Sequence, residues 1–322
     1  MTGRSTVVCA TALMALSSLA SAGCKPKSKD MPICPEMVAA GRADEAESRN
    51  LPLDVWFSVL IKNFNRTAMD PGDEPRECSN QPIAVTWPVA MTGDPRASAR
   101  KLTRDARTEN DITFAETNDG ESLVWARTDL LENGDAIGPI GLVRWVERGI
   151  EVRGIGTVQA PAQRVRMHLE PLGEDMRVLV LESETCPPEP KAGDPPPPAD
   201  APPARCVREA QIVPLAEQRF VNAPLIIDGQ DTGPARFLLA DHREEPLKDG
   251  WTRRYELTRR LEFDGTSVVV QENIRTRDCN PKEPATPCEE HIAANEKRTL
   301  AFKDGALYTT RSAWAQVGKP TP

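Results

Sequence analysis

Residues 254–270 read RYELTRRLEFDGTSVVV: apolar and charged side chains alternate up to an Asp-Gly pair, and a run of valines follows. Successive side chains of a β-strand point to opposite faces, so this alternation predicts a strand with one dry and one wet face. Asp-Gly between two such runs is the strongest short signal for a β-hairpin. The segment therefore predicts an antiparallel hairpin that turns at Asp264-Gly265. Its apolar positions are Tyr255, Leu257, Leu261 and Phe263, and its charged positions include Arg254, Glu256, Arg260 and Glu262.

The same signals recur along most of the chain. Asp304-Gly305 joins 300–302 to 307–308, and Arg148-Gly149 joins 141–147 to 150–157. The uninterrupted apolar run Val178–Leu181 predicts a strand buried on both faces. Together these runs predict a mainly β protein, an antiparallel meander that forms a large curved sheet with a barrel-like or sandwich body. Further strands are predicted at 83–87, 112–115, 122–127, 165–169, 176–181 and 207–213.

One or two helices are expected near the N-terminus. Residues 53–64 (LDVWFSVLIKNF) place apolar side chains three and four residues apart, which makes a single stripe. Such a stripe predicts a helix packed against the core. A second short helix is expected around 35–46, and 97–107 is either a mostly polar helix or a loop.

The composition is that of an acidic globular protein. Of 322 residues, 39% are hydrophobic and 27% charged, the formal net charge is −8, and aromatic residues reach only 5%. An acidic, aromatic-poor chain argues against nucleic acid as a partner. Beyond the N-terminal segment, no apolar run approaches the roughly 18 residues that a membrane-spanning helix needs.

The first 23 residues have the parts of an export signal. Arg4 supplies a positive charge, and the apolar stretch 7–16 is followed by small residues. The junction Ser21-Ala22-Gly23-Cys24 resembles the lipobox of bacterial lipoproteins, with Ser21 where that family normally has Leu. The resemblance implies cleavage before Cys24, which then carries a diacylglycerol thioether and an N-acyl chain such as palmitate. The alternative is ordinary secretion with cleavage after Ala22, which leaves Cys24 as a plain thiol.

Residues 24–50 are expected to be a tether. It begins with the basic stretch Lys25–Lys29, which suits a stalk beside anionic head groups. Two or more acyl chains anchor a protein stably in a bilayer. Lys25, in place of the Asp that commonly retains lipoproteins at the inner membrane, implies an outer-membrane location facing the periplasm or the cell surface. The expected partner is therefore the membrane, reached through the lipid anchor.

Six cysteines remain once Cys9 and Cys24 are set aside, an even number that predicts disulfides in an exported chain. Two pairs each bracket a proline-rich excursion that cannot form sheet, and the last pair follows by elimination. No CxxC or HxxxH spacing occurs, so no metal site is predicted. The predicted disulfides are Cys186–Cys206, Cys279–Cys288 and Cys34–Cys78.

The proline-rich segment 187–205 has the composition of an interdomain linker. If the cysteines that flank it pair, however, the strands before and after it lie side by side and the segment is a loop. We therefore predict a single β-rich body over 51–322. Two β subdomains divided near 186–206 are the alternative.

The sequence offers little that points to catalysis. No phosphate-binding loop, GxGxxG turn or GxSxG elbow occurs. His168 is expected on the polar face of a strand, and although His242 and His291 have acidic neighbours, no second ligand lies at metal spacing from them. Residues 224–241 resemble the start of a retropepsin-type aspartic protease. Asp241, however, lacks the following small residue and Gly, and Asp231-Thr232-Gly233 falls where a turn is expected, so a plain hairpin is preferred. The carboxylates of this segment also lack EF-hand spacing for Ca²⁺.

These observations favour a non-catalytic envelope lipoprotein, a disulfide-stapled binding or structural module with no cofactor. Two alternatives remain open. One is a carrier that holds a lipid or another hydrophobic ligand in the cavity of a curved sheet. The other is a hydrolase whose site no motif reveals.

Overall fold

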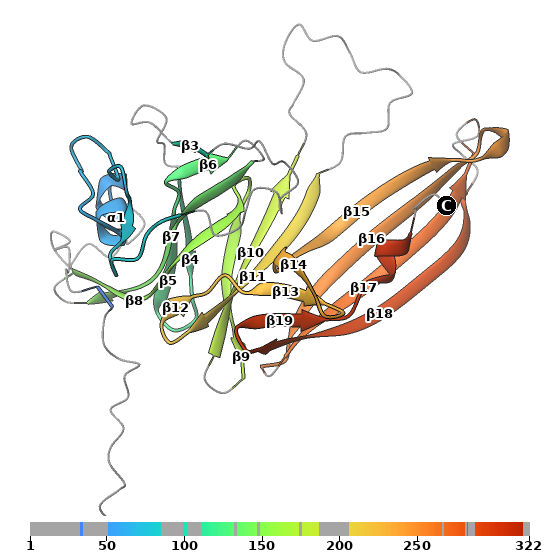
Figure 1. The fold of residues 1–322 in the computed structure, drawn as a ribbon. Coiled ribbons are helices and arrows are strands. Elements are labelled where there is room, and N and C mark those ends of the chain that lie inside the picture. Colours follow the sequence, from blue (N-terminus) through green and yellow to red (C-terminus); the bar gives the residue numbers. More distant parts are fainter. Residues whose placement is uncertain are drawn as a thin grey trace, which may run out of the picture. The chain divides into compact units, whose positions relative to one another are not determined.

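The hairpin predicted around Asp264-Gly265 is present in the computed structural model (Figure 1). Strands β16 (Thr252–Phe263) and β17 (Val268–Cys279) pair antiparallel from Thr252↔Cys279 to Phe263↔Val268. The Asp264 carboxylate accepts a hydrogen bond from the Ser267 amide at 2.7 Å, and Gly265 adopts a φ of 84°. The second Asp-Gly hairpin is also confirmed, because Asp304 and Gly305 adopt φ of 50° and 78°.

The structure describes residues 33–34, 51–84, 99–101, 111–131, 134–146, 149–173, 176–186, 206–265, 267–280, 282 and 287–317. The predicted lipidation site, the signal peptide, the tether apart from Ile33 and Cys34, and the loop 187–205 lie outside these residues. The other elements, in chain order, are α1 (Leu53–Leu60), β1 (Ile61–Lys62), β2 (Arg76–Glu77), β3 (Ala99–Lys101), β4 (Ile112–Glu116), β5 (Glu121–Ala126), β6 (Asp129–Leu131), β7 (Asp135–Val146), β8 (Gly149–Pro161), β9 (Arg166–Leu172), β10 (Met176–Thr185), β11 (Val207–Ala216), β12 (Arg219–Phe220), β13 (Pro224–Ile227), β14 (Gln230–Pro234), β15 (Arg236–Pro246), η6 (Lys248–Gly250), β18 (Glu289–Lys303), β19 (Ala306–Thr309) and η7 (Ala313–Gln316).

The prediction of a mainly β protein is confirmed, but the finer topology differs from a barrel-like antiparallel meander. The main sheet is mixed, because β12 pairs parallel with β8 and β13 pairs parallel with β19. Strands β3, β4 and β14 each pair with a single strand among the described residues, so the described sheet has open ends and does not close. Local alternation predicts strands but carries no information about which distant strands pair, and the parallel contacts join such distant segments.

Helix α1 packs where the apolar stripe of 53–64 predicts, but it is shorter than predicted. It ends at Leu60, and Ile61–Lys62 continue as β1, paired with β2. The helix buries Trp56 and Phe57 against one face of β5, β7 and β8. The approach to β7 is close, because a Cβ on Gly141 would lie 2.4 Å from Cδ2 of Leu60. Glycine at this position lets the helix reach the sheet.

The central strands are covered on both faces. Alternate residues of β5, β7 and β8 face either the α1 core or a second core that they share with β9, β10 and β11. The run Val178–Leu181 is at most 2% exposed along its whole length, as predicted for a strand buried on both faces. A partly buried ion pair joins β15 to β7, because the Arg236 guanidinium donates to both oxygens of Asp135 at 3.1 and 2.8 Å.

The three disulfides join the pairs predicted from the sequence: Cys34–Cys78, Cys186–Cys206 and Cys279–Cys288. Strands β10 and β11, on either side of the proline-rich segment, pair from Arg177↔Leu215 to Thr185↔Val207. That segment is therefore an excursion from one continuous sheet.

The strand predicted at 83–87 is wrong where the structure describes it, because Ile83 and Ala84 lie in a loop. The rest of that range falls outside the described residues.

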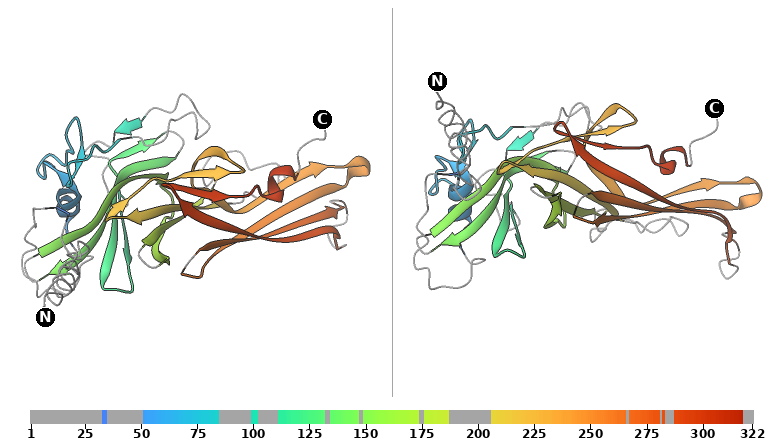
Figure 2. Two further views of the ribbon diagram at one scale, coloured as in Figure 1. Left: turned by 60° about the horizontal axis from the view of Figure 1, so that its bottom comes forward. Right: turned by 90° about the horizontal axis from the view of Figure 1, so that it is seen from below.

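Strands β15 to β18 lie side by side in the C-terminal half of the chain (Figure 1). Strand β15 pairs with β11 over Arg236–Ala240 and then continues beside β16 over Ala240–Pro246. The C-terminal residues 311–317, which include η7, pack on one face of this four-stranded sheet (Figure 2). We call residues 311–317 the C-terminal strap. No helix among the described residues is long and apolar enough to span a bilayer.

Candidate binding groove on the C-terminal sheet

The two faces of strands β16, β17 and β18 carry different polar groups. Register places Arg259, Glu272 and Glu296 in one row across the three strands. Side chains alternate between faces, so the rows on either side of this one point to the opposite face. We call the face with Glu272 and the strap the inner face, and the opposite face the outer face. The outer rows are Thr258, Asn273 and Asn295, and then Arg260, Gln271 and Lys297.

A buried charge cluster lies on the inner face. The Arg259 Nε donates to Glu272 Oε2 at 2.5 Å, and an Arg298 Nη2 donates to the same oxygen at 3.1 Å. The Glu272 side chain is 0% exposed, and the two arginine side chains are 8% and 7% exposed. Two cations thus compensate one carboxylate in a desolvated place, which joins three adjacent strands.

The same cluster fastens the C-terminal strap. The Ser312 hydroxyl donates to Glu272 Oε1 at 2.5 Å, and Arg298 donates to the Thr310 carbonyl at 2.7 Å. Trp314 follows, 3% exposed, with its indole N–H donating to Asp241 at 3.0 Å. The Arg243 guanidinium lies 4.7 Å from the centre of the Trp314 ring and donates to the Val317 carbonyl. The strap therefore covers the inner face, whereas on the outer face of the same strands Thr258, Arg260, Asn295 and Lys297 are exposed within the described part of the chain.

Acid is expected to weaken this clamp. Burial raises the pKa of Glu272, but the hydrogen bond from Ser312 and the charges of Arg259 and Arg298 outweigh burial and hold the pKa below its ordinary 4.5. A carboxyl group with a lowered folded-state pKa contributes stability that is complete above the unfolded pKa and is lost as the pH falls through the folded one. We therefore expect the urea midpoint of Glu272→Gln to depend less on pH below 4.5 than that of the native chain. Parallel pH dependences in the two proteins would contradict this account.

The outer face holds a groove of about 400 Å³ over the same three strands. It is lined by the six residues of the two outer rows and by Arg259, Glu272 and Glu296 of the row between them. The Asn273 amide donates to the Asn295 side-chain carbonyl at 2.7 Å, which orders the middle of the groove. Thr258, Arg260, Asn295 and Lys297 are exposed, so these side chains are accessible to a ligand.

The charges in and beside the groove are not balanced within the described residues. Arg254 pairs with Glu244 at 3.1 Å, and Arg277 pairs with Glu256, both on this outer face. Arg260 and Lys297 in the groove, and Arg275 beside it, have no ion pair with any described carboxylate. Amides, a hydroxyl and uncompensated cations form hydrogen bonds and attract anions, which is the chemistry of binding.

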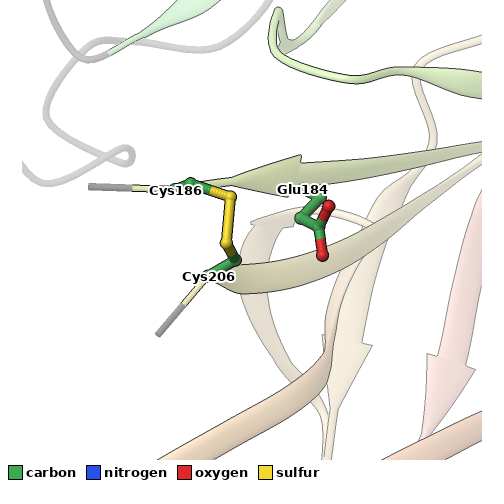
Figure 3. A group of neighbouring side chains, drawn as sticks. All are labelled: Glu184, Cys186 and Cys206. Atoms are coloured by element: carbon green, nitrogen blue, oxygen red, sulfur yellow. A yellow bond between two sulfur atoms is a disulfide. The ribbon is translucent and has the colours of Figure 1, made fainter. Parts of the chain in front are cut away.

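A second hollow, of about 560 Å³, lies near the Cys186–Cys206 disulfide, but its charges are mostly paired. Arg164 pairs with Glu184 at 3.1 Å, and Arg208 lies 3.9 Å from Glu182. Glu184 and the two sulfur atoms lie within 4.8 Å of one another (Figure 3). Both sulfurs are bonded to each other, and metals bind thiolates, so this group does not make a metal site.

The protease-like segment forms a hairpin, as preferred from the sequence, but its turn lies elsewhere. Asp228 and Gly229 adopt φ of 50° and 81° and connect β13 to β14, so Asp231-Thr232-Gly233 lies within β14 and is not the turn. Asp241 binds the Trp314 indole, and Asp228 lies 3.6 Å from Arg311. These contacts are structural, and they give the two carboxylates different partners.

Two of the predicted histidines, His291 and His168, each lie beside a carboxylate. His291 Nε2 lies 2.9 Å from Asp278, whose carboxylate also receives two hydrogen bonds from Arg253. The hydrogen bond from Arg253 is the main reason that the pKa of Asp278 lies below its ordinary 3.8. His168 is partly exposed and lies 3.8 Å from Glu170, in keeping with the polar strand face predicted for it.

Sequence reasoning missed the groove and the buried cluster, although a signal for the cluster was present. Arg259 stands between Leu257 and Leu261 at dry positions of the alternation, and Glu272 stands likewise between Val270 and Ile274. A charge on the dry face of a strand requires a partner, because burying an isolated charge is costly. Two such charges on the two strands of one hairpin could have been recognised as a buried pair.

Comparisons with protein-family models, with curated proteins and with solved structures find no match for this chain.

Proposed function

We propose that this chain is a non-catalytic, lipid-anchored envelope protein whose disulfide-stapled sheet presents a ligand-binding groove. The observation that carries the proposal is the outer-face groove, with cations that no described carboxylate compensates, on strands held by a buried ion cluster. Anchoring through Cys24 in the outer membrane would present this groove to the periplasm or to the cell surface. The hydroxyl, amide and cationic groups of its lining residues offer hydrogen-bonding contacts to a polar ligand.

Two features support a preorganised groove. The Arg259–Glu272–Arg298 cluster and the strap fix the inner face of the strands that form the groove. The Cys279–Cys288 disulfide joins the end of β17 to the chain just before β18. Binding to a surface that is already ordered avoids the entropy cost of arranging it. Disulfides also suit an oxidising compartment outside the cytoplasm.

The anchor and the groove are tested with one variant. The exported full chain with Cys24→Ala is expected to leave the membrane fraction when envelopes are washed at high ionic strength, which screens exposed charges. At low ionic strength the released protein is expected to bind back to washed envelopes in a saturable manner. The double variant Arg260→Ala/Lys297→Ala, made in the same background, should lose most of this retention in a sedimentation assay.

The matched control is Arg254→Ala/Arg277→Ala, which removes two cations from the same face outside the groove. It should bind envelopes nearly as well as its parent. Equal loss in both double variants would indicate non-specific charge attraction, and no saturable binding of the parent would overturn the binding function. A Cys24→Ala chain that stays with membranes through the wash would overturn the lipid anchor.

A further inference from the structure

We infer that the groove binds an acidic polysaccharide, a sugar polymer that carries carboxylate groups at intervals along its chain. This inference rests on the proposed binding function and names the ligand class of the same groove. It comes from three properties of the outer face of β16, β17 and β18: the spacing of its free cations, the hydrogen-bonding groups between them, and the size of the hollow.

The cations are separated from one another. Arg260 lies on β16 and Lys297 on β18, with β17 between them. Neighbouring strands are about 4.8 Å apart, so the two backbone positions are about 10 Å apart. Cations at this spacing do not suit one multiply charged group held from all sides. They match single negative charges that repeat along a polymer, and a guanidinium and an ammonium each bind a carboxylate well.

The surface between the cations suits hydroxyl groups. The hydrogen bond from Asn273 to Asn295 leaves a carbonyl oxygen on Asn273 and an amide N–H on Asn295 for a ligand. Thr258 and Gln271 add a hydroxyl and an amide. Each sugar hydroxyl both donates and accepts a hydrogen bond, so a row of mixed donors and acceptors is complementary to it.

The size and the lining of the groove argue against two other classes of ligand, a single small anion and single-stranded nucleic acid. A hollow of about 400 Å³ is within the range of roughly 300–1,000 Å³ typical of ligand sites, which is large for a single small anion. Single-stranded nucleic acid is usually bound through aromatic side chains that stack on its bases, and none lines this groove.

The test uses the exported full chain with Cys24→Ala and measures binding by affinity electrophoresis and calorimetry. The probes are polygalacturonate, neutral dextran, a phosphorylated mannan and single-stranded DNA. Polygalacturonate is expected to bind, with an affinity that falls steeply as salt is added. Arg260→Ala/Lys297→Ala should weaken this binding by at least about tenfold, consistent with the loss of two charge-assisted contacts. The control Arg254→Ala/Arg277→Ala should bind within a factor of about two of the parent, since its cations lie outside the groove.

An uncharged variant separates sugar recognition from simple charge attraction. Asn273→Ala/Asn295→Ala keeps every cation, so its binding to polygalacturonate should fall several-fold only if the amides contact sugar hydroxyls. Unchanged binding in this variant, or equal binding of DNA or of phosphorylated mannan, would overturn the assignment to carboxylated polysaccharide. Retention on envelopes without binding to polygalacturonate would overturn the ligand class alone and leave the binding function standing. Loss of envelope retention together with loss of polygalacturonate binding would reject both the ligand class and the binding function.

Discussion

Replacing Glu272 with Ala is expected to destabilise the folded chain by about 3–5 kcal/mol, the usual cost of removing one partner from a buried ion cluster. The substitution leaves Arg259 and Arg298 in a desolvated place with no carboxylate between them. It also removes the acceptor of the Ser312 hydroxyl, so the strap loses its first anchor. The free energy of unfolding is measured in urea by tryptophan fluorescence, which reports on all six tryptophans, Trp314 among them.

Two further variants serve as comparisons for the Glu272→Ala result. Glu262→Ala removes a carboxylate from the outer face of β16 and should change stability by no more than about 0.5 kcal/mol. The triple variant Arg259→Met/Glu272→Leu/Arg298→Met replaces the whole cluster with apolar side chains, and it should recover most of the lost stability. A Glu272→Ala protein as stable as the Glu262→Ala control would show that the cluster is not a clamp.

Replacing Trp56 with Ala is expected to cost about 3–5 kcal/mol, because the large cavity can collapse only in part. Trp56 is 1% exposed and lies at the centre of the core between α1 and the sheet. Its ring packs edge-on against Phe114 and Trp145, with ring centres 4.7 and 6.1 Å away. Urea unfolding followed by circular dichroism measures the loss, and the same experiment reports whether helix content falls.

The control is Trp56→Phe, which keeps an aromatic ring in the same place. The indole N–H of Trp56 is buried and donates to no described group, so removing it abandons no hydrogen bond. The Phe variant should therefore lose clearly less stability than the Ala variant. Equal losses would indicate that the volume of the indole is not what holds α1 on the sheet.

The candidate site shows where sequence reasoning reached its limit. The alternation in 254–263 placed Arg254, Arg260 and Glu262 on the wet face, and the register confirms that they share the outer face. It did not reveal that Arg260 and Lys297 flank one groove, since they lie on strands separated by β17. The strap was not predicted at all, because a seven-residue segment of mixed apolar and polar side chains is too short to carry a periodic signal.

What the sequence determined by itself is local. Alternation within a strand, the positive φ of Asp304-Gly305, and cysteines that bracket a short proline-rich loop all act between near neighbours in the chain, so the printed residues suffice to predict them. The tertiary structure alone decided the mixed, unclosed sheet and the cluster around Glu272, whose partners lie 13, 26 and 40 residues away. Such contacts exist only after distant strands have paired in one register, and that register is set by the burial of whole faces.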